Sequence, residues 1–205
     1  MSNHEERLTF LNQMIVSSSG WRGIFGDGEH SRDEQVHPRK QEVVAAAAFA
    51  IGKAMLENRD QGEVVVATDS RPTGPSLAQV VLEVFSGMEL PVRFLGVSPT
   101  PEVLAYTAAV NTRGFLILTA SHNPIGHNGV KFGFGDGRVA GGSAPRIVAE
   151  EFRSLLEESG RFEEVRRVRA LGRESGIDDV YASMGTHKRE AETAYRGKVI
   201  ESMLR

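Results

Sequence analysis

Cysteine is absent from this 205-residue sequence. The absence excludes disulfide bonds, thiol catalysis and any zinc site that needs cysteine ligands, and it is consistent with a cytoplasmic protein. Long apolar runs are also missing, because no stretch approaches the roughly 20 residues of a membrane-spanning helix. Residues 1–16 contain no basic region followed by a clean apolar stretch, so we expect no signal peptide and no membrane partner.

The sequence has no large excess of either charge. It contains 24 Lys and Arg residues against 27 Asp and Glu residues, which gives a net charge of −3. Nothing in this balance indicates a nucleic-acid partner, which would favour a basic surface. A site for an anionic substrate would therefore need a local cluster of cations.

Four short runs have the composition of strands, and helical patterns separate them. We expect strands at residues 63–68, 92–95, 114–119 and 129–134. Continuous apolar runs in two of them are typical of strands that are covered on both faces. We expect helices at residues 41–58, 76–85, 101–110 and 144–158. This alternation predicts a three-layer α/β/α domain with a mixed, mostly parallel sheet of about four strands.

The composition changes after Gly160. Residues 161–177 are rich in Arg and Glu and poor in large apolar side chains, so we interpret them as a connector. Residues 178–205 have a helical pattern and form a C-terminal helical segment. We therefore predict a first domain at residues 1–160, and at residues 161–205 a connector with the first helix of an incomplete second domain.

One turn follows a buried strand directly and contains a candidate nucleophile. Residues 119–124 read Thr-Ala-Ser-His-Asn-Pro, in which Asn123 and Pro124 shape a turn. Ligands in open α/β sheets bind at the carboxyl ends of the strands, so Ser121 is well placed for nucleophilic chemistry. A turn without any chemistry explains the same residues equally well, because such turns are common.

Lys131 follows ten residues later, at the end of the segment Asn-Gly-Val-Lys. A turn at residues 126–129 would fold this strand back beside the preceding one and bring Lys131 close to Ser121. A lysine supplies positive charge to a phosphate and can transfer a proton. Taken alone, Lys131 is better explained as a solvated lysine on an edge strand.

A third segment, residues 17–26, reads Ser-Ser-Ser-Gly-Trp-Arg-Gly-Ile-Phe-Gly. Its small residues expose backbone N–H groups that suit anions, and Arg22 offers a bidentate fork for phosphate oxygens. The alternative is a flexible N-terminal loop, which Trp21 disfavours because a large apolar side chain is costly to leave in a mobile segment.

These segments resemble, in order, the signature of the α-D-phosphohexomutases, the phosphoglucomutase/phosphomannomutase family. Residues 20–23 are similar to the opening Gly-x-Arg-Gly loop of the family, residues 67–71 to its segment after the first long helix, and residues 99–101 to its Thr-Pro segment. Residues 119–124 together with 128–131 resemble its phosphoserine loop. The resemblance covers about residues 17–158 and identifies Ser121 as the residue that carries the phosphoryl group.

The resemblance implies a reaction and a set of contacts. Phosphorylated Ser121 would give its phosphoryl group to a hexose phosphate, and the resulting 1,6-bisphosphate would turn over and return its other phosphoryl group. Lys131 and Arg22 would join Ser121 in catalysis. The residues implied to bind phosphate or substrate are Gly20, Trp21, Arg22, His122, Asn123 and Lys131. The implied cofactors are Mg²⁺, bound through the phosphate on Ser121, and a glucose 1,6-bisphosphate-type activator.

Members of this family have four domains, and the sequence lacks their metal-binding, sugar-recognition and phosphate-anchoring loops. We therefore expect the chain, without domains II–IV as partners, to be inactive in interconverting hexose 1- and 6-phosphates. Two alternatives stay open, namely a phosphoglucosamine mutase of the same family and a non-catalytic sugar-phosphate-binding relative. Intact Ser121, Arg22 and Lys131 favour an enzyme over the second alternative.

Overall fold

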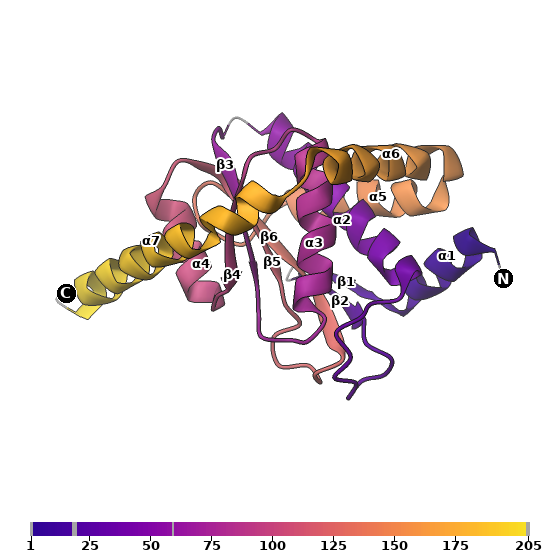
Figure 1. The fold of residues 1–205 in the computed structure, drawn as a ribbon, viewed down its shortest axis with the longest axis horizontal. Helices are drawn as coiled ribbons and strands as arrows, with labels where there is room; N and C mark the ends of the chain where they lie inside the picture. Colours follow the sequence, from indigo (N-terminus) through magenta and orange to yellow (C-terminus); the bar gives the residue numbers. More distant parts are fainter. Residues whose placement is uncertain (1, 18–19, 59, 204–205) are drawn as a thin grey trace.

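The computed structural model describes residues 2–17, 20–58 and 60–203 (Figure 1). In chain order the elements are α1 (Asn3–Gln13), β1 (Ile15–Ser17), β2 (Gly20–Ile24), α2 (Pro38–Glu57), β3 (Glu63–Thr68), α3 (Gly74–Gly87), β4 (Val92–Val97), α4 (Thr100–Ala109), β5 (Thr112–Leu118), β6 (His127–Phe134), α5 (Ala144–Glu157), α6 (Ser159–Ser175) and α7 (Asp178–Met203). The four predicted strands correspond to β3, β4, β5 and β6, and the four predicted helices to α2, α3, α4 and α5.

The described strands form one mixed sheet in the order β1-β2-β6-β5-β3-β4. β3 is parallel to both β4 and β5, whereas β6, β2 and β1 add antiparallel pairings. The predicted mixed sheet is confirmed, but it has six strands rather than about four. The parallel strands consequently make up only the β5-β3-β4 half of the sheet.

Of the two additional strands, β2 lies in the segment that we interpreted as an anion-binding loop, and β1 precedes it and shares only Ser17 with it. β2 reads Gly-Trp-Arg-Gly-Ile, a sequence whose glycines disfavour a strand locally. Pairing on both sides makes it one, because Trp21 lies opposite Val16 in β1 and Val130 in β6. β2 and β6 also approach closely, since a Cβ added to Gly129 would lie 1.8 Å from the carbonyl oxygen of Trp21. Ser18 and Ser19 of the same segment lie outside the described residues.

Alternating side chains of β3 fill a core on each face of the sheet. Val64 and Val66 of β3 belong to one core, and Val65 and Ala67 to the other. Residues of α2, α3, α5 and α6 cover the first core, and residues of α4 and α7 cover the second. Figure 1 shows α4 and the C-terminal part of α7 on one side of the strands and α2, α5 and α6 on the other. The predicted three-layer α/β/α architecture is therefore confirmed.

α6 replaces the connector that we expected at residues 161–177. The helix packs against α3 with the two backbones in contact. A Cβ added to Gly172 would lie 1.7 Å from the carbonyl oxygen of Glu83, and one added to Gly87 would lie 1.9 Å from that of Val168. The segment looked like a connector because its sequence has few apolar residues, yet Phe162 and Val165 are buried in the core and the glycines allow close packing on α3.

Ion pairs strengthen the same contact. Arg169 and Arg173 of α6 donate to the Glu83 carboxylate at 2.7 and 3.0 Å, and Glu83 is only 3% exposed. Burial by itself raises the pKa of Glu83, but hydrogen bonds and charge from Arg169, together with bonds from Gln79 and Arg173, outweigh it. The pKa of Glu83 consequently lies below its ordinary value of 4.5.

α7 forms the predicted C-terminal helical segment, of which residues 204–205 lie outside the described part of the chain. The helix lies over β4, an edge strand of the sheet, so it shields unpaired backbone groups. Lys188 of α7 donates to Glu102 at 2.6 Å and to Ser98 at 2.9 Å. No helix among the described residues is both long and apolar enough to cross a bilayer. The domain boundary at residue 160 stays a prediction.

We expect Gly172→Ala to destabilise the protein by about 1–3 kcal/mol, because the added methyl group must push α6 away from α3. Gly197→Ala is the matched control, since Gly197 is also helical and an added Cβ there meets nothing within 4 Å. The control should be neutral or about 0.5–1 kcal/mol more stable than the wild type. Urea unfolding followed by circular dichroism measures both. Equal stability of the two variants would contradict the backbone contact.

The lowered pKa of Glu83 also predicts a dependence of stability on pH. A carboxylate whose pKa is lowered by folding stabilises the protein above its ordinary pKa, and the stabilisation disappears as the pH falls through the folded-state pKa. We expect the free energy of unfolding to decrease as the pH falls below the ordinary carboxyl pKa of 4.5, and to decrease less in Glu83→Gln. Glu164→Gln changes an exposed carboxylate of α6 and should behave like the wild type. Identical pH profiles for Glu83→Gln and the wild type would refute the assignment.

Candidate functional site

The chain runs from β3 to its neighbour β4 and then crosses back past β3 to β5. α3 leads from β3 to β4 on one side, and α4 leads back from β4 to β5 on the other side. Thr68 and Leu118 lie side by side where β3 and β5 end. The segments that leave these two ends therefore diverge, and such a switch point is where open α/β sheets bind ligands.

Ser121 lies at this switch point, in the segment that connects β5 to β6. We call residues 119–127 the serine loop. The side chain of Ser121 is exposed, and its backbone has a φ of +56°, a left-handed conformation that only one other non-glycine residue among those described, Glu89, shares. Non-glycine residues adopt this conformation at an energetic cost, and such strain concentrates at functional sites.

Lys131 is brought to Ser121 by the antiparallel pairing of β5 and β6. The Lys131 ammonium nitrogen donates to Ser121 Oγ at 3.0 Å. Lys131 lies opposite Ile117 in the ladder, so the turn between the strands folds β6 back as the sequence predicted. The contact joins an exposed serine hydroxyl to a cation.

Gly20 provides room for the Lys131 side chain. A Cβ added to Gly20 would lie 3.1 Å from Lys131 Cγ and 3.2 Å from the carbonyl oxygen of Val130. Gly20 also has a φ of +134°, which residues with a side chain rarely adopt. The structure thus associates Gly20 with the position of Lys131, while its contact with phosphate stays a prediction.

Arg22 and Trp21 are neighbours in β2 and point to opposite faces of the sheet. Arg22 is partly buried, and its guanidinium lies 3.5 Å from the side-chain oxygen of Asn123 in the serine loop. Trp21 is 1% exposed and stacks on Phe152, with the ring centroids 4.7 Å apart. The Arg22 side chain therefore reaches the serine loop, whereas the Trp21 indole belongs to the core.

His122 is exposed beside Ser121, and Asn123 is partly buried. The Asn123 amide nitrogen lies 3.5 Å from Nδ1 of His127, the residue at which β6 begins. Asn123 thus links Arg22 with the far end of the serine loop. The contacts of His122 and Asn123 with phosphate stay predictions.

Sequence reasoning assigned no role to Asp69, Arg71 or Thr119, which the structure joins to Ser121. Thr119 Oγ1 donates to Asp69 Oδ2 at 2.7 Å and accepts a hydrogen bond from the Ser121 backbone N–H at 3.0 Å. Arg71 donates to Asp69 and to backbone carbonyls of the serine loop. The available signal was an Asp-x-Arg triplet directly after a buried strand, next to the strand that carries the serine.

Asn128 also went unassigned, although it precedes Lys131 in the same motif. Its side chain is fully buried, donates to Thr73 Oγ1 at 2.9 Å and accepts from the Gly129 backbone N–H at 2.8 Å. These bonds tie the start of β6 to the start of α3. Asn128 therefore supports the strand that carries Lys131.

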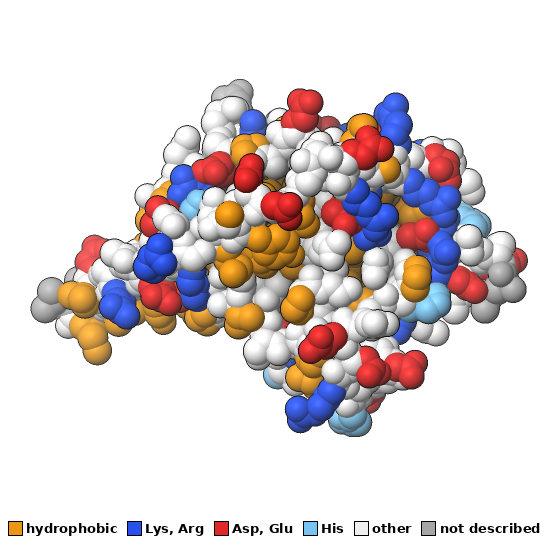
Figure 2. Space-filling model, in the orientation of Figure 1, with side chains coloured by type: hydrophobic (Ala, Val, Ile, Leu, Met, Phe, Trp, Pro, Cys, Tyr) orange, Lys and Arg blue, Asp and Glu red, His pale blue; other side chains and the backbone are white. Residues whose placement is uncertain are grey.

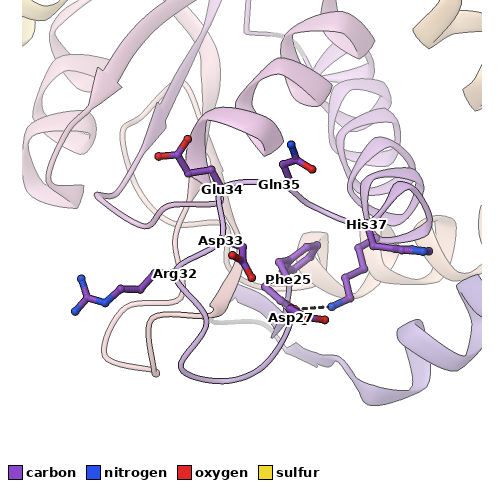
Figure 3. A pocket seen from close by; sticks show the side chains of 9 residues that line it. Phe25, Asp27, Arg32, Asp33, Glu34, Gln35 and His37 are labelled. Atoms are coloured by element: carbon purple, nitrogen blue, oxygen red, sulfur yellow. Dashed lines mark hydrogen bonds between the residues drawn. The ribbon is translucent and has the colours of Figure 1, made fainter.

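A hollow of about 680 Å³ lies next to the serine loop (Figure 3). The backbone N–H groups of Phe25 and Gly26 both donate to the Gly126 carbonyl at 2.9 Å, which joins the wall of the hollow to the loop. Its lining residues are Phe25, Gly26, Asp27, Arg32, Asp33, Glu34, Gln35, His37 and Lys40. Three carboxylates against two permanent cations make this hollow a poor site for a sugar phosphate.

No group of three or more His, Cys, Asp or Glu side chains in the described part of the chain is arranged to hold a metal ion. Asp69, the carboxylate beside the serine loop, already accepts hydrogen bonds from Arg71 and Thr119. The described residues therefore do not fit a complete Mg²⁺ site, which requires several oxygen ligands.

Comparisons with known proteins find similarity over most of the chain. Residues 13–158 match the family model of the phosphoglucomutase/phosphomannomutase α/β/α domain I. Phosphoglucosamine mutases from Thermotoga maritima and Psychrobacter arcticus are 35% identical over 114 residues and 24% identical over 169 residues. These matches cover 56% and 79% of this chain but only 23% and 35% of the two relatives. A crystal structure of a phosphomannomutase-like protein from Thermus thermophilus is 28% identical and has a TM-score of 0.55, over 67% of this chain and 29% of that one.

The left-handed backbone of Ser121 predicts that glycine at this position gives a more stable protein than alanine. Ser121→Gly should be about 1 kcal/mol more stable than Ser121→Ala, because both variants lose the hydroxyl but only glycine removes the strain. Urea unfolding of both variants measures the difference. An alanine variant as stable as the glycine variant would be incompatible with a positive φ at this position.

Proposed function

Because this chain belongs to the phosphoglucomutase/phosphomannomutase family, we propose that Ser121 carries the phosphoryl group of a phosphohexomutase reaction. The observation that carries the proposal is the 3.0 Å contact between Lys131 Nζ and Ser121 Oγ at the switch point of the sheet. An exposed hydroxyl with a cation at hydrogen-bond distance has the components that a phosphoryl carrier needs.

The transfer consists of one bond exchange at phosphorus. The bond between phosphorus and Ser121 Oγ breaks while a bond forms between phosphorus and a hydroxyl oxygen of the hexose phosphate. The sugar hydroxyl loses a proton and Ser121 Oγ gains one. Lys131 is suited to deliver that proton, because its ammonium group already donates to Oγ, and it recovers the proton that the sugar loses.

Positive charge around the serine loop would stabilise the phosphorylated state. A phosphoserine carries about −1.5 to −2 charges at neutral pH. Lys131 contacts Ser121 directly, and Arg22 reaches Asn123 two residues further along the loop. Phosphoryl transfer depends mainly on such positioning and charge stabilisation.

The proposed substrates are hexose 1- and 6-phosphates, with a 1,6-bisphosphate as intermediate and activator. The names of the curated relatives favour glucosamine phosphate, and that of the Thermus relative favours mannose phosphate. Mg²⁺ would bind an oxygen of the phosphate on Ser121, with its other ligands supplied from outside this chain. Domains II–IV would supply those ligands and the sugar clamp, in a cytoplasmic setting that the absence of cysteine supports.

The proposal predicts that Ser121 takes up one phosphoryl group when the chain is incubated with glucose 1,6-bisphosphate or glucosamine 1,6-bisphosphate. Intact-mass and peptide mass spectrometry would locate it. Ser121→Ala should take up none, and Lys131→Met should react about 10²-fold more slowly. The chain alone should not convert glucose 1-phosphate to glucose 6-phosphate. Phosphorylation at another residue, or turnover by the chain alone, would overturn this account.

A further inference from the structure

The Arg71 side chain lies beneath the serine loop and is only 7% exposed. Its two terminal nitrogens donate to four backbone carbonyls of the loop. The distances are 3.0 Å to Ser121, 2.7 Å to Asn123 and 2.9 Å to His127, and the fourth carbonyl belongs to Pro124. One guanidinium group thus binds the loop from the nucleophile to the first residue of β6.

The remaining donor of the guanidinium is held by Asp69. Arg71 Nε donates to Asp69 Oδ2 at 3.1 Å, and the Arg71 backbone N–H donates to Asp69 Oδ1 at 3.1 Å. A guanidinium has five N–H groups that can donate, and in Arg71 there is an acceptor for each of them. Asp69, which follows β3, therefore holds the Nε end of the side chain, and the two terminal nitrogens bind the serine loop.

This network binds both the backbone N–H and the backbone carbonyl of Ser121. The Ser121 carbonyl accepts from Arg71, and the Ser121 N–H donates to Thr119 Oγ1, which itself donates to Asp69. A left-handed backbone at a serine is strained and persists only where its surroundings enforce it. Arg71 binds the carbonyl that follows this strained residue, and Asp69 holds the Thr119 hydroxyl that accepts from the N–H before it.

We propose that Arg71 is the positioning residue that keeps Ser121 in its left-handed conformation, in which Oγ meets Lys131. Arg71 contacts no reacting atom, so it acts through the loop and not on the substrate. A lysine could not replace it, because a single ammonium group cannot span four carbonyls and a carboxylate. The effect on phosphoryl transfer rests on the proposed function, whereas the effect on the conformation of Ser121 does not.

Arg71→Lys tests the proposal, with Arg113→Lys as the matched control. Arg113 also donates to backbone carbonyls, at 3.1 Å to Asp60 and 3.5 Å to Met55, but it lies at the start of β5, at the opposite end from the serine loop. Three measurements are made on each variant. They are the φ of Ser121 from the HN–Hα coupling and Cα chemical shift, amide hydrogen exchange in residues 121–127, and phosphoryl uptake from glucose 1,6-bisphosphate.

In Arg71→Lys we expect the positive φ of Ser121 to be lost, exchange of the serine-loop amides to become at least about tenfold faster, and phosphoryl uptake to fall by a similar factor or more. Arg113→Lys should change none of these. In an Arg71→Ala variant, added guanidinium at millimolar concentration should restore slow exchange in residues 121–127, and it should not alter urea unfolding.

Two outcomes would overturn the proposal. One is a positive φ and slow exchange in Arg71→Lys, and the other is an equal loss of both in Arg113→Lys, which would indicate a general loss of stability. If the wild type takes up no phosphoryl group but Arg71→Lys still loses the conformation of Ser121, the proposed function fails and the positioning role of Arg71 stands.

Discussion

Two parallel strands, β3 and β5, end side by side, and the segments leaving them run in opposite directions across the sheet. This divergence opens a place where polar groups can meet above a buried core. Asp69 and Arg71 follow β3, the serine loop follows β5, and the antiparallel β6 adds Lys131. Asp69 and Arg71 reach the serine loop only through this arrangement, because they lie about fifty residues before it in the chain.

The exposed side chain of Ser121 lies above an interior of hydrogen-bonded polar groups. Ser121 is exposed and strained, whereas Arg71, Thr119 and Asn128 below it are buried or nearly so. Buried polar groups are costly unless each donor and acceptor finds a partner. Here Arg71 and Thr119 bind Asp69 and the loop backbone, and Asn128 binds Thr73 and Gly129. A satisfied network of this kind is rigid, and a rigid loop can hold a serine in a conformation that it would not adopt in a free chain.

The helices outside the family match are held in a different way. α6 and α7 each add a few side chains to the cores, and charged contacts with the sheet domain supplement this packing, such as those of Glu83 with Arg169 and of Glu102 with Lys188. Figure 2 shows apolar side chains gathered in a patch near the middle of this face, with charged side chains around it and further apolar side chains along the end of α7. α7 covers the edge of the sheet that would otherwise present unpaired backbone groups.

The sequence by itself determined the central strands, the helices between them and the pairing of Ser121 with Lys131. Apolar runs, helical periodicity and a short turn are local signals, and they act between residues that are close along the chain. Tertiary structure alone decided that residues 20–24 form a strand, that Trp21 lies in the core, and that residues 161–175 form a helix. It also decided that Arg71 binds the serine loop fifty residues away. Strand pairing, backbone contact at glycines and the hydrogen bonds of a buried guanidinium all depend on partners distant in sequence, which no local pattern specifies.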